Sequence, residues 1–340
     1  MNFRSDNVTG IAPEILAAIA AVNAGPAPSY GEDEITERLG RRVAELFEHE
    51  VAVFPVATGT AANALALATL TPPWGAIYCH EAAHIQSDEC GAPEFFAAGA
   101  KLLPLAGEDA KLMPATVEAA LLERGVVHHV QPSALSISQA TEAGTLYRPA
   151  EIAALGALAR RHGLALHMDG ARFANAVAAL GCTPAELSWR SGVDVLSLGA
   201  TKNGALAAEA VVFFDPARAA DFAFRRKRGG HLFSKMRFLS VQLDAYLADG
   251  LWLRHAAHAN RLASRLSAGL TALPDARLRH PTEANEVFVE LPERVIDAFS
   301  RAGFGFYRWG GGVSNCLRFV TAFDTRESDV ERLIAVARAT

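Results

Sequence analysis

Apolar residues recur along the chain in two patterns: short continuous runs, and longer segments in which they return every three or four positions. The first pattern is typical of buried β-strands, and the second is typical of helices that pack on a core. The short runs predict strands at residues 51–56, 77–79, 101–105, 126–130, 135–138, 164–168, 195–198 and 210–214. The longer segments predict helices at residues 13–22, 37–47, 60–70, 114–124 and 149–162.

Strands and helices alternate through this part of the chain. Strands that are joined by helical crossovers run parallel, and the helices cover both faces of the sheet. We therefore predict an α/β fold in which helices sandwich a mostly parallel sheet.

The last third of the chain has a different pattern. Residues 235 to about 273 are helical in pattern, with Gly250 as a break between two helices. Beyond them, strand and helix patterns mix at residues 286–291, 294–301, 316–319 and 327–337. We expect residues 1–240 to form an N-terminal arm and a large α/β domain, and residues 241–340 a connecting helix and a small α+β domain.

The composition of the chain is typical of a globular protein and excludes several other classes. With 51% hydrophobic and 20% charged residues the chain can bury a large core, and a net charge of −5 gives no basic surface for nucleic acid. Neither a membrane-spanning apolar run nor a signal peptide is recognisable, so we expect no contact with a membrane. The four cysteines lack a Cys-x-x-Cys pair, which favours reduced thiols in a cytoplasmic protein over disulfides or a metal site.

Lys202 is the first candidate for a reactive catalytic residue. It is one of five lysines and follows the small and apolar residues 195–201, whereas the other four lie in loop-like or arginine-rich stretches. An amine in dry surroundings loses its proton readily and can then form a Schiff base with a carbonyl group. The alternative is an ordinary lysine whose amine reaches solvent at the end of a strand.

A second candidate is the turn at residues 57–63, Ala-Thr-Gly-Thr-Ala-Ala-Asn, which follows a predicted strand and opens a predicted helix. Free backbone N–H groups at a helix N-terminus favour an anion, and Gly59 allows close approach. A capping turn without a ligand explains the same residues equally well.

A third candidate is Asp169, which ends the apolar run at 164–168 and is followed by Arg172. Ligands gather at the carboxyl ends of parallel strands. A carboxylate there can keep a pyridinium nitrogen protonated, and an arginine can bind a substrate carboxylate through two hydrogen bonds. A structural Asp–Arg pair is the alternative.

In this order, a phosphate turn, a strand-end aspartate and a strand-end lysine are the groups that pyridoxal phosphate requires. The chain resembles the fold-type I pyridoxal-phosphate enzymes and, more closely, the L-threonine aldolases of the β-eliminating lyase group. The resemblance rests on motifs spread over nearly the whole chain: Arg4-Ser5-Asp6, residues 29–33, Thr58-Gly59-Thr60, His84, residues 169–172, Thr201-Lys202 and Arg318.

The resemblance implies retro-aldol cleavage of L-threonine, L-allo-threonine and related β-hydroxy-α-amino acids to glycine and an aldehyde. It implies a set of residues that bind pyridoxal phosphate, with Lys202 forming the Schiff base: Gly59, Thr60, His84, Asp169, Arg172 and Lys202. Lys235, with the basic run at 225–228, would contact phosphate from a partner subunit or belong to a solvated helix face.

The same resemblance implies how an amino acid substrate binds. Ser5, Arg172 and Arg318 would hold its carboxylate, and Tyr30 would reach it from a neighbouring subunit, so we expect a homo-oligomer, a dimer or a tetramer. His84, Asp88 and His129 would act near the β-hydroxyl, although His128 could take the place of His129. For His84 a polar loop histidine is the alternative, and a metal site lacks a third ligand.

Two departures from the family pattern concern the pocket. Asn7 replaces the commoner threonine, and Ser138-Gln139-Ala140-Thr141 lacks the familiar Glu-Asn-Thr. Both leave the choice of aldehyde and the threo/erythro preference open. Rival functions on the same frame are β-elimination or transamination of an amino acid, and a catalytically inactive binding protein.

Overall fold

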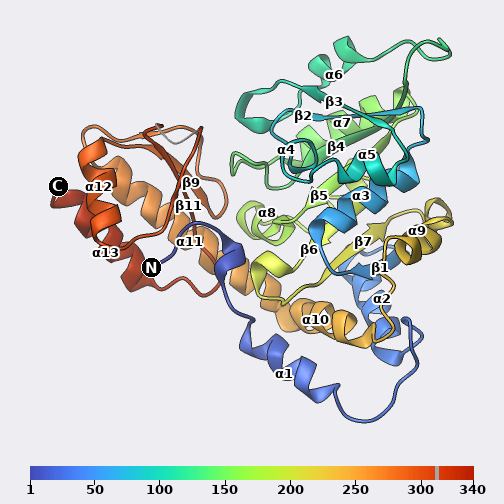
Figure 1. The fold of residues 1–340 in the computed structure, drawn as a ribbon, viewed down its shortest axis with the longest axis horizontal. Helices are drawn as coiled ribbons and strands as arrows, with labels where there is room; N and C mark the ends of the chain where they lie inside the picture. The colour runs from blue at the N-terminus through green and yellow to red at the C-terminus, as the bar shows by residue number, and fades with distance from the viewer. Residues whose placement is uncertain (311–313) are drawn as a thin grey trace.

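The computed structural model describes residues 1–310 and 314–340, and two β-sheets organise them (Figure 1). The larger sheet has seven strands in the order β1-β7-β6-β5-β4-β2-β3. These strands are β1 (Ala52–Val56), β2 (Gly75–His80), β3 (Lys101–Leu105), β4 (Gln131–Ser138), β5 (Ala165–Gly170), β6 (Val195–Gly199) and β7 (Glu209–Phe213). Neighbours from β3 to β6 are parallel, and β7 is antiparallel to both β6 and β1. The prediction of a mostly parallel α/β sheet is confirmed.

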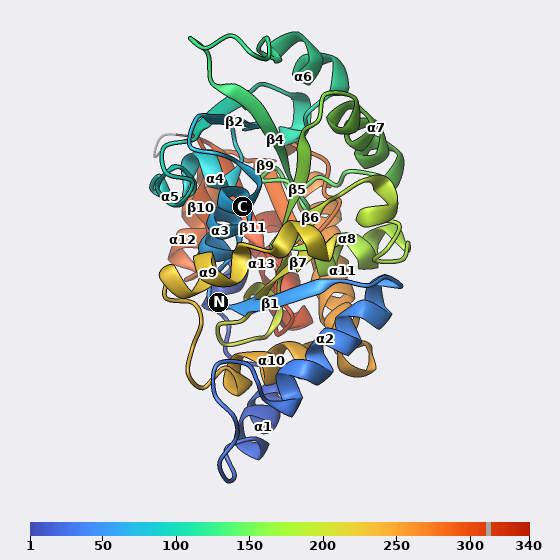
Figure 2. The same cartoon turned by 90° about the vertical axis from the view of Figure 1, so that its right-hand side faces the viewer.

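Helices cover both faces of this sheet. The helices of the large unit are α1 (Pro13–Ala21), α2 (Glu34–Phe47), α3 (Gly59–Leu70), α4 (His84–Ser87), α5 (Ala92–Phe96), α6 (Pro114–Ala120), α7 (Pro149–Arg161), α8 (Phe173–Leu180), α9 (Phe222–Arg228) and α10 (Arg237–Leu247). Along β6, Val195 packs in a cluster with residues of α3 and α9, whereas Leu196 packs with residues of α2, α7 and α8. Because successive strand residues point to opposite faces, this division places α3 and α9 on one side and α2, α7 and α8 on the other (Figure 2).

Capping residues set where the helices begin. Helix α2 starts before the predicted position because the Asp33 side chain accepts hydrogen bonds from the backbone N–H groups of Ile35 and Thr36. The Thr58 side chain accepts from the N–H of Ala61 and so starts α3 directly after β1 and its turn.

The prediction of a strand at residues 126–130 is wrong, and the helix expected at 114–124 ends at Ala120. This stretch is a loop in which Val127 is 91% exposed. The Gln131 side chain accepts from the N–H of Gly125 and donates to the carbonyls of Val126 and His129. None of the described strands pairs with this apolar run, and the Gln131 side chain satisfies some of its backbone polar groups instead.

A long helix, α11 (Leu251–Thr271), leads to a second, antiparallel sheet of four strands in the order β10-β11-β9-β8 (Figure 1). This sheet and its helices are β8 (Arg277–Leu278), β9 (Glu286–Glu290), α12 (Glu293–Arg301), β10 (Tyr307–Arg308), β11 (Cys316–Val320) and α13 (Glu327–Arg338). Gly250, at a φ of +69°, directly precedes α11 and takes the left-handed conformation that the break requires.

The N-terminal arm joins the two sheets. Phe3 is buried in the core of the small sheet, its N–H donates to the carbonyl of Gly305, and its carbonyl accepts from Val320. The arm then crosses to the large sheet, where the chain continues into α1 (Figure 1). A division into domains at residues 240 and 241 stays a prediction. Among the described residues, no helix combines the length and apolarity needed to span a membrane.

Candidate active site

A cavity of about 330 Å³ opens where β4, β5 and β6 end and α3 begins. Its lining brings together Asn7, Ala57, Thr58, Gly59, Thr60, Asn63, His84, Glu89, Glu142, Asp169, Ala171, Thr201, Lys202, Ala207 and Glu209. The carboxyl ends of parallel strands share one edge of a sheet, which explains why residues far apart in sequence meet here. Several residues predicted from sequence meet in this cavity: Gly59, Thr60, His84, Asp169 and Lys202.

Asp169 lies at the carboxyl end of β5, paired in register with Ser138 of β4 and Ser197 of β6. It is 7% exposed, so its carboxylate needs partners within the protein. Oδ1 accepts from the N–H of Ala171 at 3.0 Å, and Oδ2 accepts from Nδ2 of Asn63 at 2.8 Å. These two bonds fix the carboxylate at the cavity wall.

Lys202 lies in the short turn that follows β6, and Glu209 opens the next strand, β7. Both line the cavity. Glu209 is buried, and its Oε2 accepts from the N–H of Ala200 at 2.9 Å. Burial raises the pKa of Glu209 to about 7, so near neutral pH this carboxyl group can hold or release a proton beside Lys202.

The turn before α3 offers an anion site. Gly59 and Thr60 form the first turn of this helix, where backbone N–H groups lack acceptors within the helix. A methyl group added at Gly59 would meet no atom within 4 Å, so the backbone here faces open space.

His84 opens α4 and is held by a carboxylate that the sequence analysis missed. Its Nδ1 lies 2.9 Å from Oε1 of Glu89, and this oxygen also accepts from Nδ2 of Asn63 at 2.9 Å. The hydrogen bond to Glu89 raises the pKa of His84, against the effect of burial. Asn63 therefore connects Glu89 to Asp169, and His84 joins the same buried network.

Asp88 does not take the place that we expected for it. Its side chain is exposed and accepts from the hydroxyl of Ser87 at 2.7 Å, and within the described chain it is not part of the cavity wall. The next residue, Glu89, is buried and lines the cavity instead. The turn between α4 and α5 points adjacent carboxylates in opposite directions, which their sequence positions alone do not reveal.

The two arginines predicted to bind a carboxylate, Arg172 and Arg318, are paired with acidic residues. Arg172 is buried, and its Nε and Nη2 donate to the carboxylate of Asp6 at 2.8 and 3.0 Å. Glu286 lies between the arginines, with Oε2 3.5 Å from Nη1 of Arg172 and Oε1 accepting from Nε of Arg318 at 3.1 Å. Among residues 1–310 and 314–340, the cavity lining includes neither arginine.

Other predicted residues lie away from the cavity of their own chain. His129 is in the exposed loop before β4, at the amino end of that strand, whereas the cavity lies at its carboxyl end. Tyr30 and Lys235 are exposed, and the ring of Tyr30 lies 4.8 Å from Nζ of Lys227. Ser5 caps a short helical turn by accepting from the N–H of Asn7.

Besides Glu89, three residues of the cavity wall were not predicted from the sequence: Asn63, Glu142 and Glu209. Glu142 comes shortly after β4, and burial raises the pKa of its carboxyl group. The rule that selected Asp169, a carboxylate at a strand end, also points to Glu142. Asn63 could also have been selected from the sequence. It lies one turn into the helix that follows the proposed anion turn, so its side chain was a candidate for the same site.

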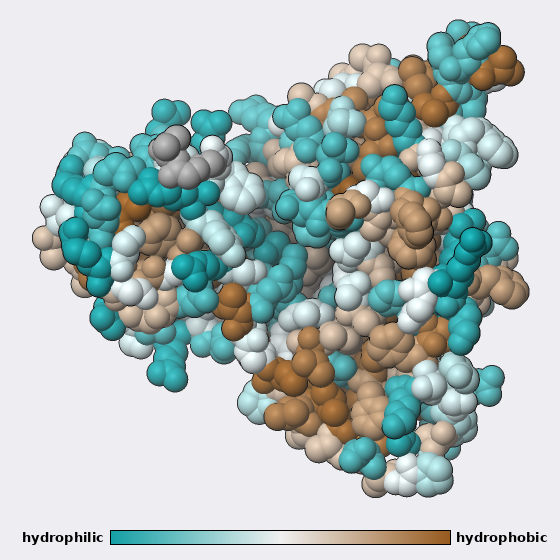
Figure 3. Space-filling view, viewed as in Figure 1, coloured by the Kyte–Doolittle hydropathy of each residue, from teal (hydrophilic) through white to brown (hydrophobic). Residues whose placement is uncertain are grey.

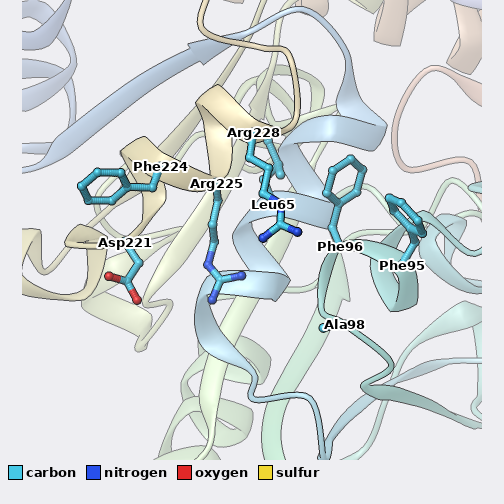
Figure 4. A pocket seen from close by; sticks show the side chains of 8 residues that line it. All are labelled: Leu65, Phe95, Phe96, Ala98, Asp221, Phe224, Arg225 and Arg228. Carbon is cyan, nitrogen blue, oxygen red and sulfur yellow. The ribbon is translucent and has the colours of Figure 1, made fainter.

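A second cavity, of about 600 Å³, lies on the outer surface between α3, α5 and α9 (Figure 4). Its wall is made mainly of phenylalanine and arginine side chains: Phe95, Phe96, Phe224, Arg225 and Arg228, with Leu65, Ala98 and Asp221. It shares no lining residue with the cavity around Lys202.

The chain is similar to known proteins over nearly all of its length. Residues 2–293 match the family model described as β-eliminating lyase. The low specificity L-threonine aldolase of a Pseudomonas species is 47% identical over 337 residues, covering 99% of this chain and 97% of that protein. Its counterpart in Pseudomonas aeruginosa is 47% identical over 336 residues, covering 99% and 96%.

Solved structures support the same relationship. A threonine aldolase structure from Leishmania major is 31% identical and superimposes with a TM-score of 0.93, covering 99% of this chain and 98% of that one. The crystal structure of mouse CSAD, at 15% identity and a TM-score of 0.77, shares the fold. With a lysine, an aspartate and an anion turn around one cavity and relatives this similar along the whole chain, the protein belongs to the low-specificity L-threonine aldolases of the β-eliminating lyase family.

Proposed function

We propose that this enzyme cleaves L-threonine, L-allo-threonine and related β-hydroxy-α-amino acids to glycine and an aldehyde. The observation that carries the proposal is the single cavity in which Lys202, Asp169 and the turn at Gly59 and Thr60 converge. The 47% identity to low specificity L-threonine aldolases selects this reaction among those that such a cavity can support.

The cofactor of this family is pyridoxal phosphate, and the residues of the cavity fit it. The open space at Gly59 and the free N–H groups of α3 suit its phosphate, Asp169 offers a fixed carboxylate to its ring nitrogen, and Lys202 offers an amine. Among the described residues no donor reaches the buried Oδ1 of Asn63, which leaves an acceptor free at the same wall.

When bound, pyridoxal phosphate withdraws electrons from the bonds at Cα of an amino acid. Lys202 would bind it covalently through Nζ, Gly59 and Thr60 would hold its phosphate, and Asp169 would keep a proton on its ring nitrogen. His84 would contact the ring and accept the proton of the substrate β-hydroxyl as the Cα–Cβ bond breaks. We assign this last role to His84 rather than to Asp88 or His129 because, of the three, His84 lines the cavity.

The substrate carboxylate would be held at the margin of the cavity by Arg318 and Arg172, with Ser5 nearby. Nη1 of Arg318 has a long contact of 3.4 Å with the carbonyl of Arg4, so it can turn to a stronger acceptor. Nε and Nη2 of Arg172 are held by Asp6, and Nη1 lies 3.5 Å from Oε2 of Glu286, so a substrate carboxylate would share Nη1 with Glu286. Glu286 would keep the two guanidinium groups at a fixed separation.

We also propose that the enzyme is a cytoplasmic homo-oligomer, a dimer or a tetramer. Phe95 and Phe224, at the rim of the outer cavity, are 78% and 76% exposed (Figure 4). A second apolar area lies over α1, where Leu16 is 53% exposed (Figure 3). Exposed apolar surface of this kind is typical of contacts between subunits, and such contacts would let Tyr30 and Lys235 serve a neighbouring cavity.

A product assay with L-threonine, L-allo-threonine and phenylserine tests the reaction. We expect equimolar glycine and aldehyde from each active substrate. Formation of a 2-oxoacid with ammonia would instead indicate β-elimination, and dependence on an added amino acceptor would indicate transamination. An absorbance change with glycine but no product from any substrate would indicate a binding protein and overturn the proposal.

A further inference from the structure

His84 and Glu89 form a hydrogen-bonded pair at the wall of the cavity. Nδ1 of His84 lies 2.9 Å from Oε1 of Glu89, and Glu89 is buried while the histidine is partly exposed. Glu89 therefore holds the Nδ1 edge of the imidazole, and Nε2 lies on another edge of the ring.

The hydrogen bonds of Asn63 determine which atom of this pair carries the proton. Nδ2 of Asn63 donates both to Asp169 at 2.8 Å and to Oε1 of Glu89 at 2.9 Å. The opposite orientation of the amide would place its oxygen against two carboxylates, which is unfavourable. Oε1 of Glu89 is thus an acceptor, so the hydrogen shared with His84 belongs to Nδ1.

Three acidic groups face the imidazole from different elements. Glu89 lies between α4 and α5, Glu142 lies after β4, and Asp169 ends β5. The hydrogen bond to Glu89 has the largest effect on the pKa of His84 and raises it, while burial acts in the opposite direction. Burial in turn raises the pKa of Glu89, and its hydrogen bonds to His84 and Asn63 oppose this effect.

We propose that Glu89 is a positioning residue that keeps His84 in the Nδ1–H tautomer, with Nε2 free to accept a proton. Asn63 completes the arrangement because it connects the glutamate to Asp169, the carboxylate that would hold the ring nitrogen of the cofactor. The proposal rests on the assignment of His84 to the β-hydroxyl and explains how that histidine is oriented and charged. Glu89 would act on the reaction through His84.

Nuclear magnetic resonance on the full-length, cofactor-loaded protein tests the pair directly. With ¹⁵N-labelled histidine, the signal of His84 is assigned among the 11 histidines by its loss in His84→Asn. We expect the Nδ1–H tautomer in the native protein. Glu89→Gln keeps an acceptor of the same size but removes the charge, so the tautomer should persist while the pKa of His84 falls.

Two further variants separate charge from packing. Glu89→Asp keeps the charge but shortens the side chain, so the pKa should fall less than in Glu89→Gln while the tautomer becomes mixed. Glu81→Gln removes an exposed carboxylate three positions before His84 and should leave the titration of His84 unchanged. Identical titration curves of His84 in the native protein, Glu89→Gln and Glu81→Gln would overturn the proposal.

Kinetics then connects the pair to the reaction. In Glu89→Gln, the limb of the kcat/KM profile that reports the base should move to lower pH. Cleavage should fall more than the exchange of the Cα proton of glycine, which needs no hydroxyl chemistry. If the pKa of His84 moves as expected but both reactions fall equally, the pair stands and the assignment of His84 to the hydroxyl fails.

Discussion

At the scale of single residues, Lys202 carries the most direct test. Lys202→Ala should abolish turnover while the protein still folds, because the turn at Gly59 and the carboxylate of Asp169 remain. The cofactor should then wash out during dialysis, and borohydride should fix none of it to the protein. Irreversible fixation in this variant would assign the covalent bond to another lysine, and Lys227 and Lys235 would be the next to test.

Arg318 tests how the substrate carboxylate is held. Arg318→Ala should raise KM and lower kcat/KM, and the loss should correspond to about 2 to 5 kcal/mol of transition-state binding. The cofactor content should stay the same. Steady-state kinetics and cofactor absorbance measure the two effects. Arg308→Ala is the matched control, because that arginine lies on the neighbouring strand and pairs with exposed Glu293. Equal losses in the two variants would show that the carboxylate binds elsewhere.

Glu209 makes the stability of the protein depend on pH. Burial raises the pKa of Glu209 from 4.5 to about 7, so between these values the folded state keeps a proton that the unfolded state has lost. The free energy of unfolding is therefore highest below pH 4.5, where Glu209 is protonated in both states. It falls by about 3 kcal/mol in all as the pH rises from 4.5 through 7.

Glu209→Gln cannot ionise, so its free energy of unfolding should stay higher than that of the native protein above pH 7. Its stability should also fall less between pH 4.5 and 7. Denaturant titrations across this range measure the difference, with Glu81→Gln as the exposed control. Parallel pH dependence in the native protein and Glu209→Gln would contradict the expectation.

At the scale of elements, the start of α3 connects stability to cofactor binding. The Thr58 hydroxyl accepts from the N–H of Ala61 and fixes the first turn of the helix. Thr58→Ala should cost about 1 kcal/mol of stability, the usual contribution of such a cap. It should also weaken cofactor binding, because the N–H groups of Gly59 and Thr60 lose their fixed direction.

Thr58→Ser keeps the hydroxyl and is the control for this element. Thermal unfolding and equilibrium dialysis of the cofactor measure the two effects separately. If Thr58→Ala and Thr58→Ser bind the cofactor equally well, the cap is structural alone and the anion site does not depend on it.

At the scale of the whole molecule, the exposed phenylalanines test the proposed assembly. Phe224→Glu places a charge on the rim of the outer cavity and should lower the molar mass measured by light scattering. Activity should fall with it if Tyr30 and Lys235 act on a neighbouring subunit. Val127→Glu, at another highly exposed apolar residue, is the control and should leave the mass unchanged. A native protein that is already monomeric would refute the assembly.

The order of the elements and the central chemical groups were readable from the sequence because they depend on local patterns. The apolar run of β5 ends directly before Asp169 and that of β6 shortly before Lys202, so both could be selected as candidates from their positions. Gly59 and Thr60 followed from a strand, a turn and a helix in succession. The same local reasoning failed at residues 126–130, because a strand also needs a neighbour to pair with.

Tertiary structure decided which of the remaining polar side chains meet. Asp6 and Arg172 are 166 positions apart, and they form an ion pair because the N-terminal arm crosses between the two sheets. Glu89 rather than Asp88 reaches His84 because the turn after α4 directs one side chain inward and the other outward. Strands and turns depend on residues that are close together in the sequence, so local patterns predict them. The contacts of Arg172 and His84 depend on how distant segments pack, so local patterns do not predict them.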